Sequence, residues 1–287
     1  MMKKHADKGK KIISIILALI SLIIFCYWQN NSIAITKSDY KNPKIPKEFE
    51  GFVIAQISDL HNKEFGNNQN ILLDKLKSIS PDIIVVTGDL IDRRKYNLEI
   101  SMEFIEGAVE IAPVYYVSGN HEEWSGKYED IKSGLLNAGV KVLDDEKDSI
   151  SIENASIDIL GLRDPDFYTS NYLEGTKTAQ LEANLKKWTN DNGFKILLSH
   201  RPELFDLYVK SNMDLIFSGH AHGGQVRLPF IGGLVAPDQG FFPKYTSGHH
   251  VKNNSTMYIS RGLGNSIIPL RIFNRPEIVE VTLKNTN

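Results

Sequence analysis

The stretch Phe52-Val-Ile-Ala-Gln-Ile57, followed at once by Ser58-Asp59-Leu60-His61, decides the fold of this 287-residue chain. It is a short apolar run that ends abruptly in polar side chains able to bind a metal ion. The same pattern recurs four times, with apolar runs at residues 83–86, 114–117, 195–198 and 215–217, followed by Thr87-Gly88-Asp89, Ser118-Gly119-Asn120-His121, Ser199-His200 and Ser218-Gly219-His220-Ala221-His222. Short apolar runs bounded by turn residues predict buried strands.

Segments with helical periodicity lie between several of these strands. Apolar residues recur at steps of three and four over residues 72–79, 98–112 and 181–188, which predicts three amphipathic helices. Alternating strands and helices predict a largely parallel sheet with its ligands at the carboxyl ends of the strands. Residues 149–160 read as a hairpin, and short strands are expected near 257–260 and 277–283. Two packed sheets flanked by helices accommodate both patterns.

Composition narrows the class of protein. With 41% hydrophobic and 24% charged residues, the chain is globular rather than disordered. The formal net charge of -2 provides no overall basic surface, so a nucleic-acid partner is not expected. The single cysteine, Cys26, excludes an intrachain disulfide and a cysteine-based zinc site.

The N-terminal segment has the features of a membrane anchor. Five lysines lie in residues 1–11, and only two serines interrupt the apolar residues 12–28, which end in Tyr27 and Trp28. This pattern predicts a cytoplasmic basic segment (1–11), a transmembrane helix (12–28), a linker (29–50) and an outer domain (51–287) in a single-pass membrane protein. The alternative is secretion after cleavage of a signal peptide near Ser32-Ile33-Ala34. The apolar run is longer than the roughly 7–15 residues of a signal peptide, which favours the anchor.

The strand ends carry seven side chains suited to divalent metals. Histidine, carboxylate and amide ligands fit Mn, Fe or Zn, among which the sequence does not choose. Seven side chains exceed what one ion binds while keeping an open position, so two ions bridged by one carboxylate are expected. Such a pair, about 3.5–4 Å apart, generates hydroxide and stabilises phosphoryl displacement. The seven are Asp59, His61, Asp89, Asn120, His200, His220 and His222.

These blocks, in their order along the chain, resemble the calcineurin-like metallophosphoesterase superfamily over about residues 52–285. The matching motifs are Asp59-x-His61, Gly88-Asp89-x-x-Asp92, Gly119-Asn120-His121-Glu122, His200 and Gly219-His220-x-His222. Three later motifs resemble the bacterial membrane-associated branch, which includes UDP-2,3-diacylglucosamine pyrophosphatases; they are Gly223-Gly224-Gln225, Arg261-Gly-Leu-Gly264 and Arg275-Pro-Glu277. The resemblance implies an α/β fold, a four-layer αββα sandwich of two mixed β-sheets flanked by helices, here preceded by one N-terminal transmembrane helix.

The resemblance also implies roles for individual residues. One metal would be bound by Asp59, His61, Asp89 and His222. The other would be bound by Asp89, Asn120, His200 and His220, with Asp89 as the bridge. His121 takes the position of the residue that protonates the leaving oxygen or stabilises the transition state.

Further residues around this site carry weaker expectations. Asp92 is expected to orient a ligand histidine rather than to bind metal. Arg93 and Arg163 are possible phosphate-binding residues, although solvated arginines are the commoner case. Phe241 and Phe242 are expected in the core, with a substrate slot as the alternative. The segment from Asp164 to Thr178 is expected to border the substrate.

The function expected from the sequence is therefore that of a membrane-anchored phosphoesterase with two divalent metals. It would hydrolyse a phosphoester or pyrophosphate of an envelope or lipid-linked substrate by metal-hydroxide attack. One alternative is a UDP-2,3-diacylglucosamine-type pyrophosphatase, against which the outward-facing domain argues. Another is a non-catalytic, metal-binding anchored protein, against which the complete ligand set argues.

Overall fold

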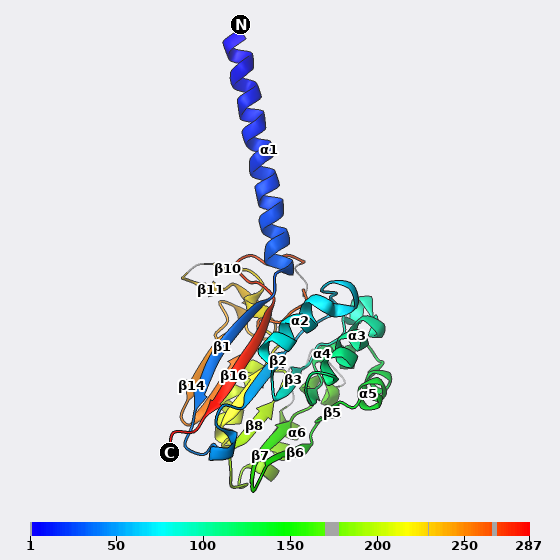
Figure 1. Ribbon diagram of the computed structural model, residues 1–287, viewed down its shortest axis with the longest axis vertical. Helices are drawn as coiled ribbons and strands as arrows, with labels where there is room; N and C mark the ends of the chain where they lie inside the picture. The colour runs from blue at the N-terminus through cyan, green and yellow to red at the C-terminus, as the bar shows by residue number, and fades with distance from the viewer. Residues whose placement is uncertain (1, 170–177, 229, 266–268) are drawn as a thin grey trace.

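The computed structural model describes residues 2–169, 178–228, 230–265 and 269–287 (Figure 1). Two six-stranded mixed sheets dominate it. Sheet A contains, in spatial order, β1 (Ala34–Lys41), β16 (Glu277–Lys284), β2 (Val53–Ile57), β3 (Ile83–Thr87), β4 (Val114–Val117) and β5 (Lys141–Val142). Sheet B contains β14 (Gly248–Lys252), β15 (Ser255–Ile259), β9 (Leu215–Ser218), β8 (Lys195–Leu198), β7 (Ala155–Gly161) and β6 (Lys147–Ile152).

Helices cover the outer face of each sheet. On sheet A these are α2 (Asn70–Ile79), α3 (Leu98–Val109) and α5 (Tyr128–Asn137); on sheet B they are α6 (Ala179–Trp188) and α7 (Phe205–Lys210). Three buried apolar clusters fill the spaces between helices and sheet A, between the two sheets, and between sheet B and its helices. The predicted four-layer αββα sandwich is confirmed.

The strands read as apolar runs because both of their faces are buried. In β3, Val85 faces the cluster between the sheets, whereas Ile84 and Val86 face the helices. Strands β2, β3 and β4 run parallel, as do β7, β8, β9 and β15. Their registers align Ile57 with Val86 and Leu198 with Phe217, so the loops that follow these strands lie along one edge.

The predicted hairpin and the predicted helices are also confirmed. Strands β6 and β7 pair antiparallel, with Ile152 opposite Ala155. Between β9 and β14 the chain forms two small antiparallel ribbons. They consist of β10 (Arg227–Leu228), β11 (Gly232–Gly233), β12 (Val235–Ala236) and β13 (Gly240–Phe241).

The prediction of a linker over residues 29–50 was wrong. Residues 34–41 form β1, which pairs in parallel with β16 from Ala34 opposite Glu277 to Lys41 opposite Lys284. This strand could not be recognised in the sequence because its composition is polar. It is polar because β1 is an edge strand in which only Tyr40 is buried. Ile45 and Phe49, farther along the same segment, are also buried in the core.

Helix α1 (Met2–Asn31) projects from the sandwich (Figure 1). Its segment Gly9–Asn31 is 23 residues long and contains an 18-residue window with a mean hydropathy of 2.4, so it is long and apolar enough to cross a membrane. At about 1.5 Å per residue it measures roughly 34 Å, close to the thickness of a hydrocarbon core. The last turns of α1 contact the domain, where the rings of Phe25 and Phe273 lie 5.6 Å apart and Gln29 is buried.

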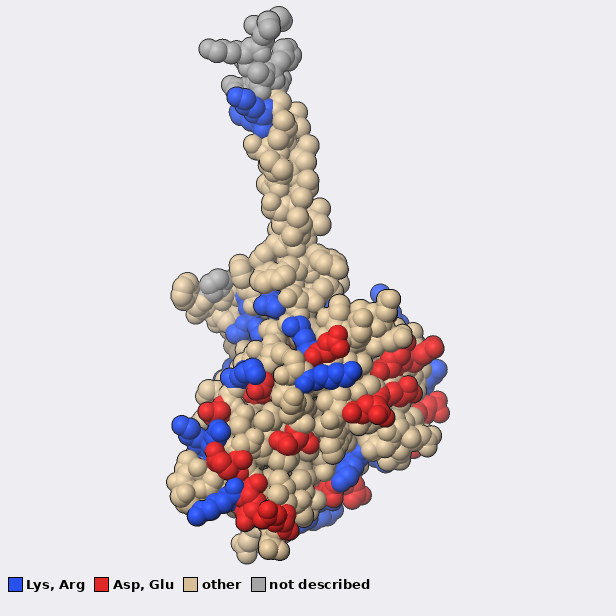
Figure 2. Space-filling model, viewed as in Figure 1, with Lys and Arg blue, Asp and Glu red and all other residues tan. Residues whose placement is uncertain are grey.

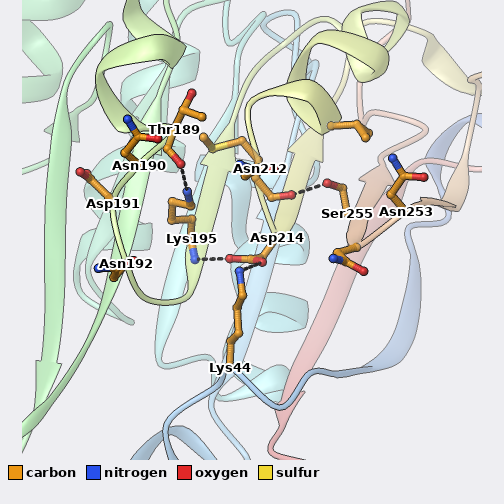
Figure 3. A pocket seen from close by; sticks show the side chains of 13 residues that line it. Lys44, Thr189, Asn190, Asp191, Asn192, Lys195, Asn212, Asp214, Asn253 and Ser255 are labelled. Atoms are coloured by element: carbon orange, nitrogen blue, oxygen red, sulfur yellow. Dashed lines mark hydrogen bonds and ion pairs between the residues drawn. The ribbon is translucent and has the colours of Figure 1, made fainter.

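A cavity of about 480 Å³ lies at the amino-terminal ends of β8 and β9 (Figure 3). One of its carboxylates, that of Asp214, binds two other residues of the lining. Lys44 pairs with Asp214 at 2.9 Å, and the backbone N–H of Lys195 donates to the same carboxylate at 3.0 Å. These contacts join the segment before β2 to sheet B, at the opposite strand ends from the predicted ligands.

Candidate metal centre

The structure brings all seven predicted ligands together at the carboxyl-terminal edges of the two sheets. Each side chain is held by a loop that leaves a parallel strand, and each residue is at most 7% exposed. Asp59 and His61 follow β2, Asp89 follows β3, Asn120 begins α4 (Asn120–Trp124), His200 follows β8, and His220 and His222 follow β9.

Four of these residues form a first group. The Nε2 atoms of His61 and His222 lie 3.0 Å apart, and His222 Nε2 lies 3.2 Å from Asp59 Oδ1. His61 Nε2 lies 3.5 Å from Asp89 Oδ2. Donor atoms about 2.1 Å from a shared ion are spaced by about 3.4 Å in a tetrahedral arrangement, so this group fits a divalent cation.

A second group shares Asp89 with the first. His200 Nε2 lies 3.4 Å from Asp89 Oδ2, 3.1 Å from His220 Nδ1 and 3.2 Å from Asn120 Oδ1. The same carboxylate oxygen of Asp89 therefore faces a histidine of each group. Such an arrangement is compatible with a carboxylate that bridges two ions.

Burial sets the charge of these groups. It lowers the pKa of His61 to about 3 and the pKa of His222 well below its ordinary value, so both imidazoles are neutral, the form that binds metal. Burial alone would raise the pKa of Asp89, but His200 and His121 outweigh it, and the pKa falls well below the ordinary range. Asp89 is thus ionised in a buried site, where a bound cation would compensate its charge.

The backbone around the site is strained. Five of the seven predicted ligands have positive φ, a region that non-glycine residues seldom adopt; they are Asp59, His61, Asp89, His220 and His222. Each such residue costs of the order of 1–3 kcal/mol and persists where the surrounding structure fixes it. The strain indicates that these loops are shaped for their side chains rather than for stability.

Glycines allow the loops to approach one another. A Cβ atom on Gly119 would lie 2.3 Å from Asp89 Oδ1, and one on Gly219 would lie 1.9 Å from Ser58 Oγ. Neither position has room for a side chain. The glycine before Asn120 and the glycine before His220 are therefore part of the site's geometry.

Hydrogen bonds orient the second group. His200 Nδ1 lies 2.7 Å from the carbonyl oxygen of Thr87, to which it donates, so Nε2 faces the ligand cluster. His220 Nε2 donates to Asp238 Oδ2 at 3.0 Å, so Nδ1 faces the cluster. Partners of this kind fix the tautomer and the ring orientation of a metal-binding histidine.

Sequence reasoning missed the residues behind His220. Arg201 is 1% exposed and donates two hydrogen bonds to Asp164, at 2.7 and 3.0 Å, and a further one to Asp238. Arg201 directly follows the predicted ligand His200 in the sequence, and this position could have been used to predict that Arg201 lies near the site. Asp164 and Asp238 lie far from it in sequence, in loops without a pattern, and only the fold brings them together.

We expect Asp238→Asn to weaken binding of Mn²⁺ by about 10–100-fold, the usual cost of losing a partner that orients a ligand. The neutral amide no longer compensates the positive charge of Arg201, and it accepts a weaker hydrogen bond from His220 than the carboxylate does. Titration of the metal-free chain with Mn²⁺ measures the effect. Asp206→Asn, at an exposed carboxylate that pairs with Lys252, is the matched control. Equal affinities in the two variants would contradict this role.

Glu122 ties two of the site loops together and was also missed. Its buried carboxylate accepts hydrogen bonds from the backbone N–H groups of Asp89, Leu90, Ile91 and Gly119, at 2.7 to 3.2 Å. Burial, followed by the charge of Asp89, raises the pKa of Glu122 to about 7. Its place three residues after Gly119, as in a helix capping box, was the available signal.

Glu122→Gln is expected to lower the free energy of unfolding by about 1–3 kcal/mol, because the amide group turns a donor toward backbone donors. Thermal or urea denaturation of the full chain in detergent measures this change. Glu129→Gln, at an exposed position of α5, serves as the control. A Glu122 variant as stable as the control would show that the four hydrogen bonds contribute nothing to stability.

His121 lies at the mouth of the cluster. Its Nδ1 accepts a hydrogen bond from the backbone N–H of Arg93 at 3.2 Å, so in the neutral ring Nε2 carries the proton. Its ring packs edge-on against His61, with 4.4 Å between centroids. Asp92 Oδ1 lies 3.6 Å from His121 Nδ1 and also accepts from Arg94. Asp92 therefore faces the predicted proton donor.

The two predicted arginines lie in different places. Arg93 lines a small pocket of about 100 Å³ together with Asp89, Asn120 and His121, and its guanidinium lies 4.4 Å from the ring centre of Trp124. Arg163 lines a separate cavity of about 320 Å³ and packs on Tyr128 and Phe167. The structure does not bring Arg163 into the pocket of Arg93. Residues 170–177 of the segment expected to border the substrate lie outside the described residues.

Fold and site together define a metal-dependent phosphoesterase, a hydrolase of phosphoric esters built on two sheets with a His/Asp cluster at their edge. The sequence profile described as Calcineurin-like phosphoesterase matches residues 52–224, and the chain belongs to this family. The family generally uses two divalent metal ions, and the buried cluster is compatible with them.

Named relatives agree with this assignment. The chain is 31% identical to "Uncharacterized metallophosphoesterase YkuE" of Bacillus subtilis (strain 168), over 91% of this chain and 89% of that protein. It is 27% identical to "Phosphodiesterase YaeI" of Escherichia coli (strain K12), over 81% and 82%. It is 25% identical to "Transmembrane protein with metallophosphoesterase domain" of Danio rerio, over 84% of this chain and 55% of that protein.

Proposed function

We propose that the protein is a membrane-anchored phosphoesterase with two metal ions that hydrolyses a phosphate ester or pyrophosphate of an envelope or lipid-linked substrate. The observation that carries this proposal is the position of Asp89 Oδ2, within 3.5 Å of histidine nitrogens from two separate ligand groups. One carboxylate between two sets of nitrogen and oxygen donors suits a dinuclear centre that acts on phosphate.

The ligand sets follow from the two groups. Asp59, His61, Asp89 and His222 would hold one ion, and Asp89, Asn120, His200 and His220 the other. When bound, the two divalent ions supply Lewis acidity and an activated water for phosphoryl displacement. Mn, Fe and Zn all suit these ligands.

Two residues at the mouth of the site would act on the substrate. In the neutral ring, the Nδ1 of His121 accepts from the backbone N–H of Arg93, and Nε2–H would donate a hydrogen bond to the leaving oxygen. In the imidazolium form, with Asp92 Oδ1 3.6 Å from Nδ1, Nε2 would give that oxygen a proton. Arg93 lines the same pocket and would pair with a phosphate oxygen. Asp92 supports the protonated form of His121 through its negative charge.

The anchor and its orientation complete the proposal. Helix α1 is long enough to span a bilayer, and the lysines at its start would keep the N-terminus in the cytoplasm and the catalytic domain outside. Cleavage near Ala34 would remove Gln29 and Ile33, which are 3% and 1% exposed. Their burial supports an anchor that is retained rather than a signal peptide that is removed.

Metal-dependent hydrolysis by the full chain in detergent tests the proposal. Dialysis against a chelator is expected to remove activity toward p-nitrophenyl phosphate or bis(p-nitrophenyl) phosphate, and Mn²⁺ is expected to restore it. The ratio of the two rates distinguishes a preference for monoesters from one for diesters. A chain that binds two ions and hydrolyses neither these esters nor a lipid pyrophosphate would favour the non-catalytic alternative. A chain that binds no metal would overturn the proposal.

A further inference from the structure

Exposed apolar side chains gather beside the end of α1. Among the described residues after α1, nine large hydrophobic side chains are exposed, and six of them belong to the ribbons β10–β13 and to the loop before β16. We call these six the apolar rim; they are Leu228, Phe230, Ile231, Phe241, Phe242 and Phe273. Phe241 is 82% exposed and Phe242 is 69% exposed, so the expectation that they pack in the core was wrong. Such a concentration of exposed apolar surface marks a site of interaction.

One member of the rim, Phe273, lies against the last turns of the apolar helix. Phe25 belongs to the continuous apolar run of α1, and its ring contacts Phe273 at 5.6 Å between centroids. Three residues later, the ring of Trp28 lies 4.8 Å below the guanidinium of Arg275. If α1 crosses a bilayer, the contact with Phe25 places Phe273 at the boundary of the hydrocarbon, because a side chain cannot touch Phe25 from outside that layer.

The junction between α1 and the domain is stiff. The backbone N–H of Asn274 donates to the buried Gln29 side chain at 3.2 Å, and Arg275 Nε donates to the carbonyl oxygen of Ser32 at 2.9 Å. Strand β1 begins two residues after Ser32 and is paired with β16 along its whole length. The segment between helix and sheet is too short and too well bonded to let the domain turn away from the membrane.

The rim is continuous with the metal centre. Asn274, next to Phe273, is fully buried and donates through Nδ2 to the carbonyl oxygen of His222 at 2.7 Å. At the other end of the rim, Pro237 lines the pocket of His121, one residue before the Asp238 that binds His220. In the ribbon β12–β13, the turn thus lines the pocket of His121, and the residues just after the turn belong to the apolar rim.

Charge on the visible face matches this arrangement. In Figure 2, the part of the domain next to α1 shows basic residues among residues other than Asp and Glu, whereas the acidic side chains begin farther from the helix. Figure 1 places the ribbons β10 and β11 beside the base of α1. Aromatic and basic residues are the types that favour the interface between bilayer and water.

We propose that the apolar rim inserts into the bilayer interface beside α1, so that the metal centre opens against the membrane surface and takes a phosphate-linked headgroup of a lipid as its substrate. This inference rests on the membrane anchoring proposed above. It narrows the substrate to an amphiphile whose phosphoester lies at the level of the headgroups.

The depth of the rim is measured with a fluorescent label on the full chain in phosphatidylcholine/phosphatidylglycerol vesicles. In a Cys26→Ser background, Phe241→Cys carries an environment-sensitive dye, and Val251→Cys, at an exposed apolar position in β14, carries it in the control. The label at 241 is expected to emit at shorter wavelength, to resist iodide and to be quenched by a lipid-borne quencher. Equal quenching by iodide at both positions would overturn the inference.

Activity provides a second, independent measurement. The variant Phe241→Ser/Phe242→Ser is expected to lose at least about tenfold of the rate on a phosphodiester lipid in vesicles, a change of about 1.4 kcal/mol, because it removes two apolar side chains from the rim. Its rate on soluble bis(p-nitrophenyl) phosphate is expected to change less than about twofold. For the control Val251→Ser, the rates on both the lipid and the soluble diester are expected to change less than about twofold. Equal losses on both substrates would overturn the inference. Inactivity of the wild type on both would refute the proposed function, and the depth of the label would still decide the position of the rim.

Discussion

Asp89→Asn is expected to reduce metal-dependent hydrolysis of phosphate esters by at least about 10³-fold, with one or both ions lost. The asparagine side chain keeps the size of Asp89 but removes the negative charge that faces both His61 and His200. Loss of a bridging ligand removes several kcal/mol of stabilisation of the transition state, and each 1.36 kcal/mol is worth tenfold in rate. Steady-state kinetics and metal analysis of the same preparation measure both effects.

The matched control for Asp89 is Asp191→Asn, which removes a carboxylate that pairs with Lys147 at the surface. The control is expected to keep two ions and its full rate, because surface ion pairs contribute little. A folded Asp89 variant that retained two ions and more than about a tenth of the wild-type rate would contradict the bridging role.

His121→Ala is expected to lower kcat by about 10²–10⁴-fold while two ions stay bound, since a positioned general acid contributes this much. The loss should be greatest for esters of alkyl alcohols, whose leaving oxygen needs a proton. It should be smaller for p-nitrophenyl esters, whose leaving group departs as a stable anion. Kinetics with both kinds of substrate, beside metal analysis, measure the difference.

His249→Ala is the control for His121, because His249 is an exposed histidine of β14. It is expected to leave both rates unchanged. If His121→Ala lost the same factor with alkyl and p-nitrophenyl esters, His121 would stabilise the transition state without giving a proton. If it lost its metal, His121 would belong to the ligand set instead.

The strands and the ligand cluster could be predicted because one physical cause produces both signals. A parallel strand buried on both faces reads as an uninterrupted apolar run, and the polar side chain directly after it lies at the edge of the sheet. Asp89 after β3 and His200 after β8 are two examples. Their separation of more than a hundred residues did not matter, because the topology brings strand ends together.

Other features had no such local cause. Strand β1 is polar because it lies at an edge, so its sequence resembles a linker. Asp238 orients His220 from a loop whose position depends on two small ribbons. Phe241 and Phe242 are a third case: large apolar residues are usually buried, so the sequence indicated the core, whereas both side chains are exposed.

The parallel pair of β1 and β16 has a consequence for how the chain is made. Lys37 in β1 meets Glu280 in β16 across 243 residues of sequence, and β16 lies between β1 and β2. The first strand of sheet A to leave the ribosome therefore waits for the last one, and until then β1 has no partner and β2 forms an open edge of the sheet. Until β16 has been made, the unfinished sheet must be kept from pairing with other chains, so sheet A cannot form strand by strand in the order in which its strands are synthesised.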